Sequence, residues 1–105
     1  MVEGSGEPRV AFEWAEQARE TRRRMREDLR AARTDLDAVL ASATTAPMVG
    51  QVRLLWALES LPGARKTDTR RRLAELDLDP AIPLELLDGR QRATVLAEFP
   101  MGERP

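Results

Sequence analysis

The stretch from Leu55 to Leu76, LWALESLPGARKTDTRRRLAEL, constrains the fold more than any other part of the chain. Its leucine-rich first part predicts a helix up to Leu61. Pro62-Gly63 ends that helix, because proline cannot continue the backbone hydrogen bonding and glycine permits a sharp turn. A second helix is predicted after the turn, with Thr67-Asp68 as its cap. The sequence therefore predicts a hairpin of two helices joined by a basic turn.

A basic turn at the start of a helix can hold an anion. The first backbone amides of a helix have no partner within it and carry the positive end of its dipole. The turn Pro62–Lys66 brings such amides to the surface, where Lys66 and Arg70 add charge. The start of the last helix, Asp88–Arg92, repeats this device with two arginines. From the spacing alone, a phosphate site and an ordinary structural turn both remain open.

The remaining segments also show helical periodicity, and period-two alternation of β-branched residues is absent, so the fold class is predicted to be all-α. A long N-terminal helix should precede a domain of about four short helices. The predicted organisation is a disordered tail at 1–9, a long charged helix at 10–33, a helical domain at 34–100 and a frayed tail at 101–105.

Capping signals set the expected boundaries of the short helices. Thr34 followed by Asp37 resembles a capping box, and Asp88 followed by Gln91 repeats that pattern. The segment Ser42–Pro47 is predicted to be a linker, because the residue before a proline is disfavoured in helical conformation. A third helix is expected from Val49 or Val52 to Leu61.

Apolar side chains in and after the hairpin define the expected core. Trp56 lies off the main leucine stripe of its helix and is expected to pack against the long first helix. In the second turn, Leu84, Leu86 and Leu87 are all expected to dock on the core.

Composition excludes several function classes. The chain has no histidine and no cysteine, which removes the usual general base, the commonest metal ligand and thiolate chemistry. An enzyme, a metal site, a cofactor and a small-molecule substrate are therefore not expected. The longest apolar run, Leu54–Leu58, is far too short to span a membrane. Residues 1–8 lack the basic and apolar regions of a signal peptide.

The formal net charge is −1, which argues mildly against a protein that coats DNA. The charges are nevertheless segregated, because cations gather at residues 19–33 and 65–72 while residues 75–88 carry only acidic groups. In the first of these segments most arginines have a glutamate at pairing distance, which favours a solvated ladder of ion pairs. Residues 65–72 have a single acidic residue and remain the stronger candidate for a polyanion site.

From about Met25 to Phe99 the chain resembles the actinobacterial integration host factor family of nucleoid-associated proteins. The resemblance is carried by the following segments: TDLDAVL at 34–40, LLWALESLPG at 54–63, Lys66, LAEL at 73–76 and RQRATVLAEF at 90–99. The sequence ESLPG followed by a basic turn, together with the RQR helix, is more specific than the leucine spacing.

This resemblance implies a helix-two-turn-helix core and a cytoplasmic protein of the nucleoid. It implies monomeric, weakly selective binding of double-stranded DNA through the phosphate backbone and minor groove, with bending or compaction. The DNA-binding residues expected on these grounds are Gly63, Arg65, Lys66, Thr67, Arg70, Arg90, Gln91 and Arg92. A secondary DNA contact on the long helix would involve Arg22, Arg23 and Arg26.

The chain departs from the family pattern at three places. Arg65 occupies a position where the family turn usually has glycine, and Asp68 one where a neutral or basic residue is usual. The second turn, often basic in the family, has no cation at Ala81–Glu85. These changes leave an alternative function open, in which the chain is a helical protein-interaction module or a paralogue with weakened DNA binding.

Overall fold

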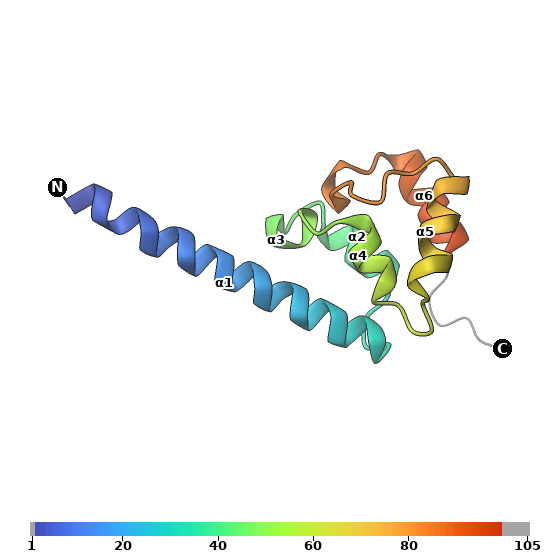
Figure 1. The fold of residues 1–105 in the computed structure, drawn as a ribbon, viewed down its shortest axis with the longest axis horizontal. Coiled ribbons are helices and arrows are strands. Elements are labelled where there is room, and N and C mark those ends of the chain that lie inside the picture. The colour runs from blue at the N-terminus through green and yellow to red at the C-terminus, as the bar shows by residue number, and fades with distance from the viewer. Residues whose placement is uncertain (1, 100–105) are drawn as a thin grey trace.

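The computed structural model describes residues 2–99, with side chains from Val10 onward. Its first element is the long helix α1, Val2–Arg30 (Figure 1). α1 thus begins at Val2 rather than near Val10, where a tail at 1–9 had been predicted. Met1 and the expected frayed tail at 101–105 lie outside the described residues.

Only the C-terminal half of α1 packs against the domain. Met25 and Leu29 are buried in the core, whereas Val10, Phe12 and Trp14 on the N-terminal half are exposed. Figure 1 shows this half projecting away from the other helices, and the molecule measures 59 × 27 × 25 Å. The helix ends at Arg30 rather than at residue 33, because Ala32 adopts a left-handed conformation with φ 59°.

Three short helices follow α1: α2 Leu36–Ser42, α3 Pro47–Gly50 and α4 Leu54–Glu59. The helix predicted to run from Val49 or Val52 to Leu61 corresponds to α4, which is shorter at both ends, and the separate helix α3 before it was not predicted. Pro47 begins α3 at a position where its missing N–H is not needed, so the expected linker is shorter than predicted.

The hairpin predicted after α4 is present. α5 runs over Lys66–Glu75, and it is followed by the second turn, a short 3-10 helix η1 at Leu84–Leu86, and α6 at Gly89–Glu98. The described residues form helices and turns, with one isolated bridge between Arg53 and Pro83 in place of any sheet. The prediction of an all-α fold with a long N-terminal helix is confirmed.

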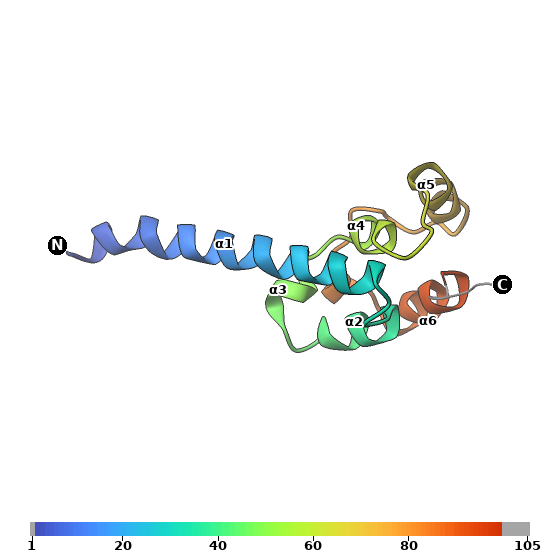
Figure 2. The same cartoon turned by 90° about the horizontal axis from the view of Figure 1, so that it is seen from below.

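A leucine-rich core joins all of these elements. Its fully buried side chains are Leu29, Leu36, Leu40, Leu54, Leu58, Leu73, Leu84, Leu87 and Val95. Figure 2 shows α4 and α5 on one side of the line of α1, with α2, α3 and α6 on the other. The expected docking of Leu86 is wrong, since its side chain remains 64% exposed while Leu84 and Leu87 are buried. In the tight 3-10 turn these three side chains cannot all face the core.

Backbone hydrogen bonds tie the start of α4 to the second turn. Leu54 N donates to Ile82 O and Leu55 N to Pro80 O, both at 2.9 Å. Leu84 N returns a bond of 2.9 Å to Val52 O. This exchange satisfies the first amides of α4 and holds the second turn beside the hairpin.

Two of the predicted caps differ in the structure. α2 is capped by Asp35, whose carboxylate accepts from Ala38 N at 2.8 Å, rather than by Thr34. α5 begins before Thr67, so the expected Thr67-Asp68 cap lies inside its first turn. The capping box of Asp88 and Gln91 at α6 is confirmed.

Gly50 marks the closest approach among α3, η1 and the end of α2. A Cβ at this position would lie 2.7 Å from both Ala43 O and Glu85 Oε1. Gly50→Ala should therefore lower the free energy of unfolding by about 1–3 kcal/mol, because the backbone must move to relieve overpacking. Urea denaturation would measure this change. Gly89→Ala is the matched control, since nothing lies within 4 Å of its added Cβ. Equal stability of the two variants would contradict the packing role of Gly50.

Candidate nucleic-acid interface

The turn between α4 and α5 is held in a defined shape by local bonds. Ala64 N donates to Leu61 O at 3.1 Å, and Gly63 has φ 76°, a conformation that a side chain would strain. Residues 62–68 are all exposed, and no atom would contact a Cβ added at Gly63. The turn is therefore a protruding surface that another molecule can approach at the level of the backbone.

The N-terminus of α5 opens onto this surface without a cap. Arg65 is its N-cap residue and makes no side-chain capping bond. The first amide of α5 that donates a backbone hydrogen bond is that of Thr69, which donates to Arg65 O at 2.9 Å. Within residues 2–99, the amides of Lys66, Thr67 and Asp68 have no hydrogen-bond acceptor. Three exposed donors and the positive end of a ten-residue helix thus meet at one spot.

Charged side chains around this terminus fall into two groups. Arg65 and Lys66 are exposed and form no ion pair within the part of the chain that the structure describes. Farther along α5, each arginine faces a carboxylate; the pairs are Arg70–Glu59 at 4.0 Å, Arg71–Asp68 at 2.8 Å and Arg72–Glu98 at 3.3 Å. Asp68, which would repel an anion, is therefore partly neutralised by Arg71. The free positive charge is concentrated at the turn itself.

The predicted second phosphate clamp at α6 has a different construction. The Asp88 carboxylate accepts from Gln91 N at 2.7 Å, and Gln91 Oε1 accepts from Asp88 N at 3.0 Å. This N-terminus therefore already carries an anion, which satisfies the amide of Gln91 and would repel a phosphate. A carboxylate also caps α2, where Asp35 accepts from Ala38 N, and the carbonyls of Ile82 and Pro80 accept from the first two amides of α4.

The two arginines of α6 differ in their exposure and in their hydrogen bonding. Arg92 is half-buried, and one of its terminal nitrogens donates to Leu87 O at 3.3 Å, so it helps to hold the loop before α6. Arg90 is exposed. The pair between Arg72 and Glu98 places the far end of α6, about 12 Å along that helix from Arg90, beside the second half of α5. The structure thus brings together residues 63, 65, 66, 67 and 70, and it leaves residues 90–92 at a separate place.

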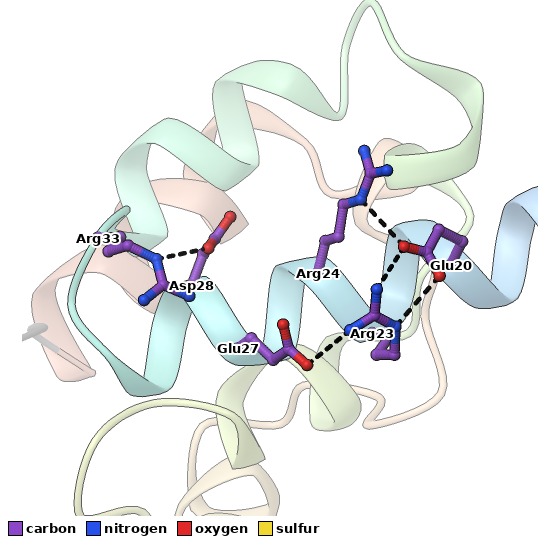
Figure 3. A network of polar contacts seen from close by, with 6 residues as sticks. All are labelled: Glu20, Arg23, Arg24, Glu27, Asp28 and Arg33. Atoms are coloured by element: carbon purple, nitrogen blue, oxygen red, sulfur yellow. Dashed lines mark hydrogen bonds and ion pairs between the residues drawn. The ribbon is translucent and has the colours of Figure 1, made fainter.

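The arginines predicted as a secondary contact on α1 are mostly engaged within the protein. Arg23 forms ion pairs with Glu20 and Glu27, and Figure 3 shows this ladder. Hydrogen bonds from Arg23 lower the pKa of Glu20 below its ordinary value, with Arg24 adding to the effect. Arg22 is half-buried. The ladder of ion pairs expected from the sequence is present.

Arg26 has a structural position that the sequence did not reveal. Its guanidinium lies 4.4 Å from the centre of the Trp56 ring, and its Nε donates to Ser60 Oγ at 3.4 Å. Ser60 is fully buried and donates to Trp56 O at 3.0 Å. The expectation that Trp56 packs against the first helix is thus confirmed through a cation–π contact. Arg26 fastens α1 to the end of α4, immediately before the turn.

Two further features bear on function. No group of three or more metal-ligating side chains occurs in the described part of the chain. Nor is any helix within residues 2–99 long and apolar enough to cross a membrane.

The fold and site define a small helical protein with an uncapped, basic helix terminus on a protruding turn. No family model matches the chain. It is 33% identical over 90 residues to integration host factor of Mycolicibacterium smegmatis, and 32% identical over 90 residues to that of Mycobacterium tuberculosis. Each match covers 86% of this chain and 86% of the relative. A solved structure of sIHF bound to an 8 bp palindromic DNA superposes with a TM-score of 0.78 and 25% identity, covering 83% of this chain and 98% of that one.

The chain belongs to the integration host factor family. The resemblance inferred from ESLPG and the RQR helix is thereby confirmed. Membership in this family also agrees with the prediction that the chain is not an enzyme.

Arg26 provides a test of the contact between α1 and the hairpin. Arg26→Gln should lower the free energy of unfolding by about 1 kcal/mol, because it removes the cation from the Trp56 ring. Arg23→Gln, on the same helix, breaks only exposed ion pairs and should change stability by less than about 0.5 kcal/mol. Chemical denaturation of both variants would compare them. A larger loss for Arg23→Gln would contradict the assigned roles.

Proposed function

We propose that this protein binds double-stranded DNA through the turn at residues 62–66 and the N-terminus of α5. The observation that carries the proposal is the set of three unbonded amides at Lys66–Asp68 beside the unpaired cations Arg65 and Lys66. A phosphate oxygen can accept from such amides while the side chains neutralise its charge. Support comes from the related sIHF, whose solved structure contains an 8 bp palindromic DNA.

Binding of this kind reads little sequence, because backbone amides and phosphate-directed cations contact no base edges. Within the proposal, Thr67 and Arg70 extend the contact along α5, and Arg90 reaches the duplex as a separate side chain. Gln91 and Arg92, first expected to bind DNA, are assigned instead to the capping box and to the loop before α6. Arg22 is retained as a secondary contact, while Arg23 and Arg26 are assigned to structural pairs.

The proposed approach is through the minor groove. A protruding turn with Gly63 and Ala64 at its tip is narrow, whereas the wider major groove is the one that admits a whole helix. The projecting half of α1 would extend the protein along or away from the duplex. We further propose that the protein binds as a monomer and bends or compacts the DNA. Its place of action would be the nucleoid, in the cytoplasm.

Fluorescence anisotropy on an arbitrary duplex tests this function. With about six phosphates engaged, log affinity should fall against log salt with a slope near −5. Arg65→Glu combined with Lys66→Glu should abolish binding at moderate salt while leaving helical content by circular dichroism unchanged. Arg19→Glu combined with Arg24→Glu reverses the same charge on exposed positions of α1 and serves as the control.

Absence of wild-type binding at low salt, or a nearly flat salt dependence, would overturn the proposal. Unchanged affinity of the variant with Arg65→Glu and Lys66→Glu would show that the turn does not contact DNA. The same titration in the presence of netropsin tests whether the protein binds in the minor groove. Netropsin occupies A·T minor grooves, so undiminished binding to an A·T-rich duplex would contradict a minor-groove approach.

A second candidate function is binding to a protein partner through α1. Phe12 is 61% exposed and Trp14 48% exposed on the projecting half, where solvent-facing aromatic side chains are unusual. Pull-down from a nuclease-treated lysate separates the two functions. A partner retained after nuclease digestion, and lost on Phe12→Ser with Trp14→Ser, would favour the protein-binding role.

A further inference from the structure

A surface hollow lies between α4, α5 and the second turn. It is lined by Arg53, Leu55, Trp56, Glu59, Arg70, Pro80 and Ala81. The lining combines an apolar floor with two arginines and one carboxylate. This combination is suited to a ligand that has apolar faces and carries negative charge.

The position of Arg53 at the hollow is fixed by its backbone. Arg53 pairs with Pro83 in the isolated bridge, and the neighbouring amide of Leu54 donates to Ile82 O at 2.9 Å. Its side chain is exposed, caps no amide of α4, and forms no ion pair with any residue of the described chain. Arg53 therefore offers a free cation at a rigid site. Arg53 is an isolated arginine outside both basic segments, so no local pattern identifies it.

One face of α5 links the hollow to the uncapped terminus of that helix. Arg70 lines the hollow and lies four residues after Lys66, so the two side chains share one face of α5. On α4, Arg53 and Glu59 are separated by six residues, or about 9 Å of helix. One strand of a duplex carries a charge about every 3.4 Å along the helix axis. Lys66 and Arg70 on one face of α5, and Arg53 at the same hollow as Arg70, thus offer three cations to the phosphates of one strand.

We propose that this hollow binds the sugar–phosphate strand as it leaves the turn, with Arg53 and Arg70 on phosphates and deoxyribose packed against Leu55 and Trp56. This inference rests on the DNA binding proposed above. The contact is independent of sequence, since sugar and phosphate are the same at every step. Arg53 becomes a DNA-binding residue that extends the interface from α5 to α4 and across to the second turn.

Glu59 is the acidic residue that lines the hollow, and its negative charge repels an anion. Its Oε2 is buried without a hydrogen bond and lies 4.0 Å from Arg70 Nε. It therefore orients Arg70 over the hollow and also cancels part of its charge. Because the second turn contributes only Pro80 and Ala81 to the lining, the uncompensated cation of Arg53 supplies most of the attraction.

Arg53→Gln tests the proposal by affinity. In anisotropy titrations on the same duplex, this variant should bind about 3- to 10-fold more weakly than wild type, with a salt slope shallower by about 1. Arg19→Gln removes the same charge from an exposed position of α1 and should bind as wild type does. If wild-type protein fails to bind duplex, the proposed function fails. If wild type binds while Arg53→Gln shows the same affinity and slope, only the present inference fails.

Trp56 tests occupancy of the hollow directly. The chain has two tryptophans and no tyrosine, so Trp14→Phe leaves Trp56 as the sole tryptophan fluorophore. Saturating duplex should protect Trp56 from acrylamide quenching, and the protection should be smaller with Arg53→Gln added. Identical quenching of Trp56 with and without bound duplex would overturn the proposal even where anisotropy confirms binding.

Discussion

The exchange of backbone hydrogen bonds between residues 52–55 and 80–84 determines which surfaces of this protein remain available. It closes the start of α4 with the carbonyls of Ile82 and Pro80 and brings the second turn against the hairpin. At α2 and α6 a carboxylate already lies at the terminus, because Asp35 accepts from Ala38 N and Asp88 accepts from Gln91 N. The terminus of α5 has no side-chain cap, and the cations Arg65 and Lys66 lie beside its free amides. This combination is the basis of the proposed anion site at α5.

Ion pairing concentrates the positive charge in the same way. The chain is nearly neutral, and three arginines of α1, Arg19, Arg23 and Arg24, form ion pairs with glutamates on the same helix. Arg26 is withdrawn from solvent by Trp56 and Ser60. Arg65 and Lys66, beside the free amides of α5, form no ion pair within residues 10–99, and neither does Arg53. A small number of well-placed cations can thus give DNA binding without a basic protein.

Much of this fold could be predicted from the sequence, because helical periodicity and the Pro62-Gly63 break are local signals. The α6 capping box was also local and was found. The errors arose where the outcome depends on neighbours in space. Asp35 displaced Thr34 as a cap, α3 formed as a separate helix before α4, and Leu86 turned to solvent.

The same contrast between local signals and spatial neighbours applies to the candidate site. The turn residues could be named from the sequence because the Pro62-Gly63 break, the cations and the start of the next helix follow one another directly in the chain. The phosphate clamp expected at α6 stays a prediction; it left out the Asp88 carboxylate, which caps the helix and lies at the same terminus. The role of Arg26 depends on a tryptophan 30 residues away in the chain and could not be read from its own segment. The contact proposed for Arg53 also depends on residues that are distant in the chain.

In the proposed complex, the amides at the start of α5 bind phosphate and those at the start of α6 do not. Titration of the isotopically labelled protein with a short duplex, followed by amide NMR shifts, measures this most directly. Large shifts are predicted at Lys66, Thr67 and Asp68, with only small shifts at Gly89, Arg90 and Gln91. The reverse pattern, with shifts at the start of α6 and none at the start of α5, would contradict the account.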